Sequence, residues 1–140
     1  MYTVLAAMTP GLLAQAYFLG FGILLNGIVL CLWCALIEAV IVLLQRPAHL
    51  STELSRHLSD GSTLLTAWLI AVCLPPDLPA GVLAVAALAA VGLAKHAYGG
   101  LGQNVFNPDM VGSAVILLSF PALLATYPSV HIDGLSGSTL

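Results

Sequence analysis

Charged residues are scarce in this 140-residue sequence, and their scarcity sets the class of protein. Only 6% of the residues are Asp, Glu, Lys or Arg, whereas 60% are hydrophobic. Soluble domains carry about 25% charged residues, so this chain lacks the polar surface that water requires. The same apolar content excludes a disordered chain. The three basic residues form no patch, which argues against a nucleic-acid-binding protein.

Cysteine and histidine are also few, and they form no recognisable reaction centre. Cys31, Cys34 and Cys73 all lie within apolar stretches and give no disulfide framework. Cys31 and Cys34, spaced i, i+3, supply too few ligands for a metal cluster, so we expect them to pack as apolar side chains. The four histidines are scattered over three separate segments between and after the spans, and no nucleophile–base pair is recognisable. The first apolar stretch lacks the features of a cleavable signal peptide.

Long apolar runs dominate what remains, and each run predicts a helix in the membrane. A hydrocarbon core about 30 Å thick needs about 20 apolar residues per helical span, so this chain supplies about four or five. The predicted spans cover residues 1–19 (interrupted at Pro10-Gly11), 22–44, 60–74, 80–94 and 110–125. We therefore expect an all-α bundle of about five transmembrane helices over residues 1–126. A polar tail follows over residues 127–140.

The basic residues predict an orientation. Arg46 and Arg56 lie between the second and third spans, and Lys95 lies at the end of the fourth. An alternating layout of five spans places these connections on one side of the membrane, and the positive-inside rule makes that side cytoplasmic. The turn at 75–79 and the tail at 127–140 would then face the periplasm of a bacterial inner membrane.

The third and fourth spans are short, and a glycine-rich segment follows them. Short or interrupted helices are typical of transporter-like cores, where irregular backbone is tolerated only if protein or a cavity buries it. A simple membrane anchor would not need them. No internal repeat is visible in the sequence, so any duplicated half would lie beyond Leu140.

Two segments carry the most specific pattern. The first reads YGGLGQNVFNPDMVG over residues 98–112, and the second reads DGLSGST over residues 133–139. Together with Asp60-Gly61-Ser62 and Leu74-Pro75-Pro76, they closely resemble the RnfD family and, more distantly, its relative NqrB of the sodium-pumping quinone reductase. The resemblance covers nearly the whole chain in the same order. For residues 98–112 it favours lining a flavin or ion pathway, and the alternative is a tight buried connection without a ligand.

The resemblance also implies that the second segment is the acceptor sequence of a flavin transferase. In the family an Asp-Gly pair is followed by Ser or Thr, then Gly, Ala and Thr, and the last threonine is esterified to the phosphate of FMN. The matching positions in this chain are Asp133, Ser136, Gly137, Ser138 and Thr139, with Thr139 as the attachment site. Without the family pattern, the segment would read as a flexible Ser/Gly linker.

Two departures from the family pattern bear on this expectation. Ser138 occupies the usual alanine position and adds a second hydroxyl beside Thr139. Only residues 125–132 separate the last span from the acceptor sequence, where the family has a longer segment, and the family's second set of helices is missing. We therefore expect the sequence to be the first half of a longer chain with two related halves.

By the same resemblance, the chain would be a subunit of the Rnf complex, which passes electrons between ferredoxin and NAD and couples this to Na+ or H+ movement. The subunit would relay electrons, would not be catalytic alone, and would supply part of the ion path. Expected partners are the other Rnf subunits, the lipid bilayer and the flavin transferase. A second, non-covalent flavin is left open. The alternatives are a non-redox channel or secondary transporter, and a structural subunit.

Glu38 is the one acid deep within a predicted span. A carboxylate at the bilayer centre costs at least about 3 kcal/mol, so it should face the bundle interior, be protonated, or lie near the cytoplasmic end. A place in the cation path and a structural hydrogen bond are the two alternatives for its role.

Three other charged residues have simpler expected roles. Lys95 should anchor its helix at the membrane interface, and it could also contact an anionic flavin or a partner subunit. Asp60, or Ser59 beside it, should cap the third span. Asp109 lies near the start of the fifth span, where its charge would interact favourably with the helix dipole.

Overall fold

The computed structural model describes residues 2–45, 61–97 and 107–125. All regular structure in these ranges is helical, which agrees with the predicted all-α fold. Within them, helical segments follow one another as α1 (Tyr2–Leu19), α2 (Gly22–Gln45), α4 (Ser62–Cys73), α5 (Ala80–Ala87), the π-type helix η1 (Leu88–Ala97), α6 (Pro108–Ser119) and α7 (Pro121–Leu124).

α2 is the one helix among the described residues that is long and apolar enough, by length and composition alone, to cross a membrane. The other apolar helices are shorter. The outward side of α2 is apolar along its length, with Leu25, Leu32 and Leu44 exposed by 59%, 66% and 75%. Such a surface suits lipid better than water. The number of five spans stays a prediction.

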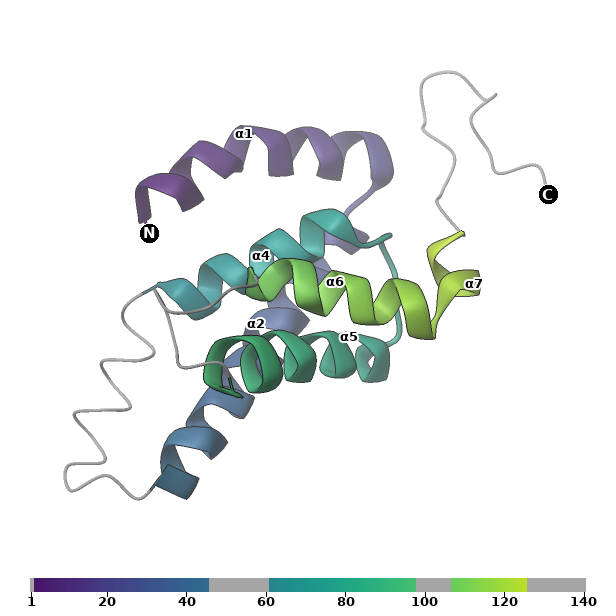
Figure 1. The fold of residues 1–140 in the computed structure, drawn as a ribbon. Coiled ribbons are helices and arrows are strands. Elements are labelled where there is room, and N and C mark those ends of the chain that lie inside the picture. The colour runs from purple at the N-terminus through teal and green to yellow at the C-terminus, as the bar shows by residue number, and fades with distance from the viewer. Residues whose placement is uncertain (1, 46–60, 98–106, 126–140) are drawn as a thin grey trace.

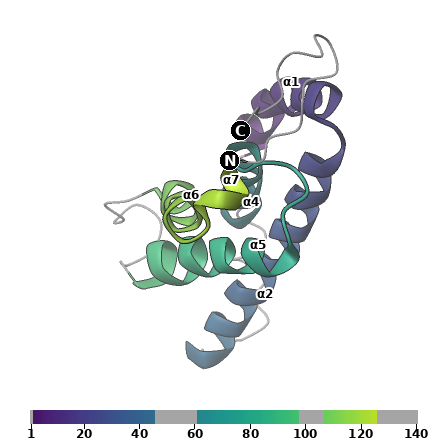
Figure 2. The ribbon, with the colours of Figure 1, turned by 90° about the vertical axis from the view of Figure 1, so that its right-hand side faces the viewer.

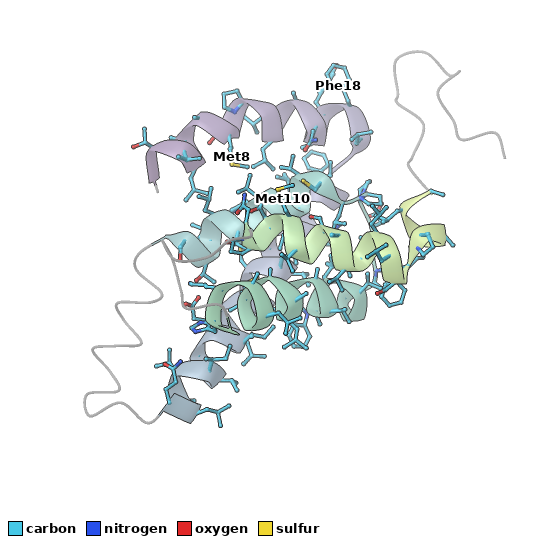
Figure 3. The ribbon with its side chains drawn as sticks, viewed as in Figure 1. Met8, Phe18 and Met110 are labelled. Atoms are coloured by element: carbon cyan, nitrogen blue, oxygen red, sulfur yellow. The ribbon has the colours of Figure 1, made fainter. Side chains whose placement is uncertain are left out.

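The helices pack around a layer formed by α4, α5 and α6. In Figure 1, α6 lies between α4 and α5 and contacts both, and α2 passes behind them at an angle. The turned view in Figure 2 places α2 on one side and α6 on the other, with α4 and α5 between them. α1 lies at the edge, where it contacts α2 and α4. Met8 points from α1 toward the other helices, and Phe18 points away from them (Figure 3).

Small residues allow the helices of this layer to approach closely. Ala86 and Ala90, from α5 and η1, are completely buried. Gly112 of α6 lies against them, because a Cβ atom at this position would be 2.9 Å from the Ala86 carbonyl oxygen and 3.1 Å from the Ala90 Cβ. Membrane helices use small residues at their contacts in this way, since packing and not the hydrophobic effect holds them together.

Gly112→Ala should therefore destabilise the protein. The added methyl has no room against the Ala86 backbone, and overpacking of this kind costs about 1–3 kcal/mol. Gly81→Ala is the matched control, because an added Cβ there meets nothing within 4 Å. Thermal unfolding in detergent compares the two variants. A Gly112→Ala protein as stable as Gly81→Ala would contradict the close packing of α6.

Two buried contacts fix the direction of α2 relative to α4. Near the start of α2, the Asn26 Nδ2 donates to the carbonyl oxygen of Pro75 at 2.9 Å, just after α4 ends. Further along α2, the side chain of Glu38 accepts a hydrogen bond from Thr63 in the first turn of α4. α2 and α4 are therefore antiparallel. Glu38 lies at the end of the bundle where α4 begins.

Two prolines act differently from the sequence-based expectation. Pro10 does not interrupt α1, which is continuous through it. The Thr9 hydroxyl beside it donates to the carbonyl oxygen of Leu5 at 3.1 Å. Proline is tolerated within membrane helices more often than within soluble ones. The predicted span 110–125, by contrast, is divided at Phe120, where α6 ends before Pro121. A residue before proline is disfavoured in the helical conformation, which explains the break.

The start of α4 also differs from the expectation. The N-cap residue is Gly61, with φ 75°, which itself has no side chain to cap the helix. Glycine suits this left-handed conformation because it has no Cβ. Asp60 and Ser59, the expected caps, precede this position and lie outside the described residues. α6, in contrast, begins at Pro108, and Asp109 lies in its first turn as expected.

Candidate functional site

Glu38 lies in the interior of the bundle. Its side chain projects from α2, and its exposed fraction is 0%. The structure therefore confirms that Glu38 faces the bundle interior, which is one of the alternatives that the sequence allowed. An acid in such a place needs partners, because an unpaired buried charge is strongly unfavourable.

The charged partner of Glu38 is Lys95, from η1. The Lys95 Nζ lies 2.5 Å from the Glu38 Oε1, and the lysine is 4% exposed. Lys95 is therefore not an interface anchor, and that expectation was wrong. The physical reason is the carboxylate: the buried charge of Glu38 would be left uncompensated if the Lys95 ammonium lay at the membrane surface.

Two hydroxyl groups and a histidine complete this group of side chains. The Lys95 Nζ donates to the Ser62 Oγ at 2.9 Å and to the Thr63 Oγ1 at 3.0 Å. Thr63 in turn donates to the Glu38 Oε2. The His96 Nε2 lies 3.7 Å from the Glu38 Oε1. We name Glu38, Ser62, Thr63, Lys95 and His96 the Glu38 cluster.

Three helix segments position the Glu38 cluster. α2 supplies the acid from its middle, and α4 supplies both hydroxyls from its first turn, directly after Gly61. Lys95 and His96 come from the last turn of η1. π-type turns are rare and occur frequently at functional sites. The cluster therefore joins the ends of two helices to the side of a third.

The hydrogen bonds of the Glu38 cluster saturate its charged groups. A lysine ammonium has three donors, and here three oxygens accept from it: one carboxylate oxygen of Glu38 and the hydroxyls of Ser62 and Thr63. Both carboxylate oxygens of Glu38 accept hydrogen bonds. The cluster thus holds one negative and one positive charge that compensate each other, in a form that a proton or a cation can perturb.

Asp109 forms a second polar feature, apart from the Glu38 cluster. It is 7% exposed, and its Oδ1 has no hydrogen-bond partner among the described residues. Asp109 and Ser113 line a cavity of about 450 Å³, together with Cys73, Leu74, Met110, Ala114, Leu117 and Leu124. Among the described residues, this lining is mostly apolar and includes no basic side chain. No group of three metal-ligating side chains exists in the part of the chain that the structure describes.

The cysteines follow the expectation from sequence where the structure describes them. Cys34 is fully buried in the hydrophobic core, and Cys31 packs against that core. Cys73 is exposed, and all three are free. Packing is therefore the role that their environment supports for Cys31 and Cys34.

The predicted flavin-attachment residues lie outside the described residues. This applies to Asp133, Ser136, Gly137, Ser138 and Thr139, and to most of the glycine-rich segment, of which only Asn107 to Gly112 are described. Their roles stay predictions. Among the predicted site residues, Glu38 is the one that the structure places.

Sequence reasoning missed the partners of Glu38, although one signal was available. The expected orientation already placed Lys95 and the end of the Glu38 helix on the same side of the membrane. Glu38 and Lys95 are also opposite charges in otherwise apolar helices. A search for charge compensation within the membrane would have paired them. Ser62 and Thr63 gave no comparable signal.

The sequence as a whole matches known proteins along its length. It matches the NQR2, RnfD, RnfE family over residues 1–140. One relative, from Vibrio cholerae serotype O1 (strain M66-2), is named as a subunit of an ion-translocating oxidoreductase complex. It is 42% identical over 124 residues, which cover 89% of this chain and 34% of the relative. A protein of the same name from Vibrio vulnificus (strain YJ016) is 44% identical over 119 residues, covering 84% and 32%.

A further relative, which carries the same name, comes from Mannheimia succiniciproducens and is 39% identical over 127 residues, or 91% of this chain. The chain thus spans about a third of the length of these relatives, 34% in this case. The apolar composition, the helical structure and the match over the full sequence agree with one another. The chain is an integral membrane protein that belongs to the NQR2, RnfD, RnfE family.

Proposed function

We propose that the chain is part of a membrane subunit of an ion-translocating oxidoreductase complex. The family match over the whole sequence and the names of the relatives support this. In the proposed complex, the subunit relays electrons between ferredoxin and NAD, and the electron flow drives Na+ or H+ across the bacterial inner membrane. The described helices belong to a bundle of about five spans, the first half of a two-repeat fold.

The proposed cofactor is FMN, held covalently at Thr139 through its phosphate. Ser136, Gly137, Ser138 and Asp133 form the rest of the segment that a flavin transferase recognises. FMN, when attached, supplies one- and two-electron chemistry. The support is the acceptor pattern of the sequence, and a second, non-covalent flavin is compatible with the proposal.

The Glu38 cluster is proposed to lie in the ion path. The observation that carries this is a fully buried Glu38–Lys95 pair inside an otherwise apolar bundle. Buried ion pairs are weak contributors to stability, and well-packed apolar residues of similar volume often replace them without loss. Ionisable residues inside membrane proteins commonly mark ion or proton paths. A purely structural role for the pair is the competing explanation, and a channel or secondary transporter would use the same cluster.

Glu38→Gln tests the ion path in the complete complex. The amide keeps the volume and can still accept from Lys95, but it removes the negative charge that a cation or proton needs. We expect ion transport to fall at least about tenfold while flavin content and uncoupled electron transfer persist. Transport is measured in proteoliposomes with an ion-sensitive dye.

Asn26→Ala is the matched control for Glu38→Gln. Asn26 is also a buried polar residue of α2, 2% exposed, but it bonds only a backbone carbonyl in the described structure. Its loss should lower stability and leave transport per folded complex unchanged. Normal transport in Glu38→Gln would reduce Glu38 to a packing role.

The proposed orientation has its own test. Arg46, Arg56 and Lys95 predict that the 46–57 connection is cytoplasmic and that the 127–140 tail is periplasmic. Thr52→Cys and Val130→Cys, each on a cysteine-free background, report this through an impermeant thiol reagent applied to spheroplasts. Position 130 should be labelled and position 52 protected. The reverse pattern would overturn the orientation.

A further inference from the structure

The Lys95 ammonium occupies a small cage of oxygen atoms. The Glu38 Oε1, the Ser62 Oγ and the Thr63 Oγ1 lie 2.5, 2.9 and 3.0 Å from its Nζ. The three residues that supply these oxygens are at most 5% exposed. The ammonium is therefore enclosed by one carboxylate and two hydroxyls, with little water.

The same oxygens would suit a free cation. Hard cations bind carboxylate oxygens and neutral oxygen ligands in preference to nitrogen or sulfur. Without Lys95, the cage would hold one uncompensated negative charge, which is strongly unfavourable in an apolar interior. The cage therefore requires one positive charge, and a small monovalent cation supplies it as well as an ammonium group does.

Lys95 is built in a way that permits it to leave. Its charge sits on a flexible four-carbon stem, and it lies in the last turn of η1, two residues before that helix ends at Ala97. An exchange of ammonium for a cation keeps the net charge of the cage constant. Such an exchange needs far less energy than emptying the cage.

We propose that the Lys95 ammonium is the resident cation of the Glu38 cluster, and that a transported monovalent cation enters the cage only by displacing it. This deepens the proposed place of Glu38 in the ion path and rests on it. Lys95 then acts as a tethered competitor. It keeps the site charge-balanced when no ion is bound and releases the ion when it returns.

Labelling of Lys95 in the intact protein tests the exchange directly. Lys95 is the one lysine of the described helices, so its modification by an amine-reactive reagent can be followed on a single peptide by mass spectrometry. In the full-length protein, rising Na+ should increase the labelling rate several-fold, because the displaced amine becomes accessible. Choline, which is too large for the cage, should have no effect at equal ionic strength. A rate independent of Na+, K+ and Li+ would overturn the displacement.

Chemical rescue gives a second, independent measurement. Lys95→Ala empties the cage and should lower the melting temperature by roughly 10 °C. Methylammonium or Na+, added at millimolar concentration, should recover most of this loss, and choline should not. Lys95→Met is the matched control, because its side chain refills the space of the lysine stem without charge and leaves less room for an added cation. A Lys95→Ala protein whose melting is indifferent to cations would contradict the cage.

Different results would contradict the place of Glu38 in the ion path and the displacement of Lys95 by a cation. If Na+ exposes Lys95 and rescues Lys95→Ala, while Glu38→Gln transports normally in the complete complex, the cage binds cations but lies outside the ion path. If Glu38→Gln abolishes transport and Lys95 labelling ignores monovalent cations, Glu38 serves transport without displacement of Lys95. In that case the displacement is overturned, while the place of Glu38 in the ion path stands.

Discussion

Thr139→Ala in the full-length protein should abolish flavin fluorescence completely after denaturing electrophoresis, whereas the unaltered protein should give a fluorescent band. A phosphoester bond survives denaturation, and a flavin held only by non-covalent contacts is lost from the unfolded chain. The effect is all-or-none because, in this proposal, the hydroxyl oxygen of Thr139 forms the ester bond to the phosphate of FMN. The experiment needs cells that also contain the flavin transferase, since an unmodified chain would be dark for a trivial reason.

Ser138→Ala is the matched control for this variant. Both hydroxyls lie in the acceptor segment, but neighbouring side chains of an extended strand point to opposite sides. A transferase that places the Thr139 hydroxyl at the flavin phosphate therefore turns Ser138 away. Ser138→Ala restores the family's usual residue and should keep or strengthen the signal. A fluorescent Thr139→Ala band would show that the attachment site is elsewhere, and a dark unaltered band would remove covalent FMN from the proposed function.

The helices were predictable where a long apolar run was bounded by glycine, proline or polar residues. The expected span 22–44 corresponds to α2 at Gly22–Gln45, and the turn at Pro75-Pro76 separates α4 from α5 as expected. A long apolar run bounded by glycine and polar residues has few alternative structures in a membrane, because every backbone group must be bonded internally. This constraint is local, so the sequence alone conveys it.

Pro10 and Pro121 show where that local reasoning stops. Proline favours a helix break at both positions. α1 nevertheless continues through Pro10, whereas α6 ends before Pro121. Pro10 lies within the continuous helix α1, whereas Phe120, before Pro121, has left the helical conformation with φ −134° and ψ 54°. Whether a proline breaks a membrane helix depends on its surroundings, and the residue type alone does not reveal the outcome.

The Glu38 cluster was predictable only in part. The insertion cost of a carboxylate singled out Glu38, because that cost depends on the residue and its depth alone. The insertion cost of Glu38 does not identify its partner, because Lys95 lies 57 residues further along the chain, at the end of an apolar helix. Ser62 and Thr63 resembled ordinary helix-start residues. Their role appears only when α2, α4 and η1 are brought together.

The energetic coupling of Glu38 and Lys95 yields the largest stability effect that we expect. Lys95→Met should destabilise the full-length protein by about 3–5 kcal/mol, because it leaves the Glu38 carboxylate buried without its cation. Glu38→Met should destabilise the protein by a similar amount, because it leaves the Lys95 ammonium buried without its carboxylate. The double variant should recover most of the loss, since two apolar side chains replace two compensated charges in a core that is already apolar. The wild type, the two single variants and the double variant form a double-mutant cycle. Denaturant titration in micelles measures the free energy of unfolding of each, with folded yield as a second readout.

The cycle separates energetic from functional reasons for keeping the pair. If the losses of the single variants simply add in the double variant, the two charges are not coupled, and the contact at 2.5 Å is incidental. If the double variant is stable but transports no ions, stability cannot be why this bundle contains a buried acid and a buried base. The charges would then be retained for ion movement. A stable double variant with normal transport would leave neither reason standing, and the Glu38 cluster would have to be abandoned as the ion site.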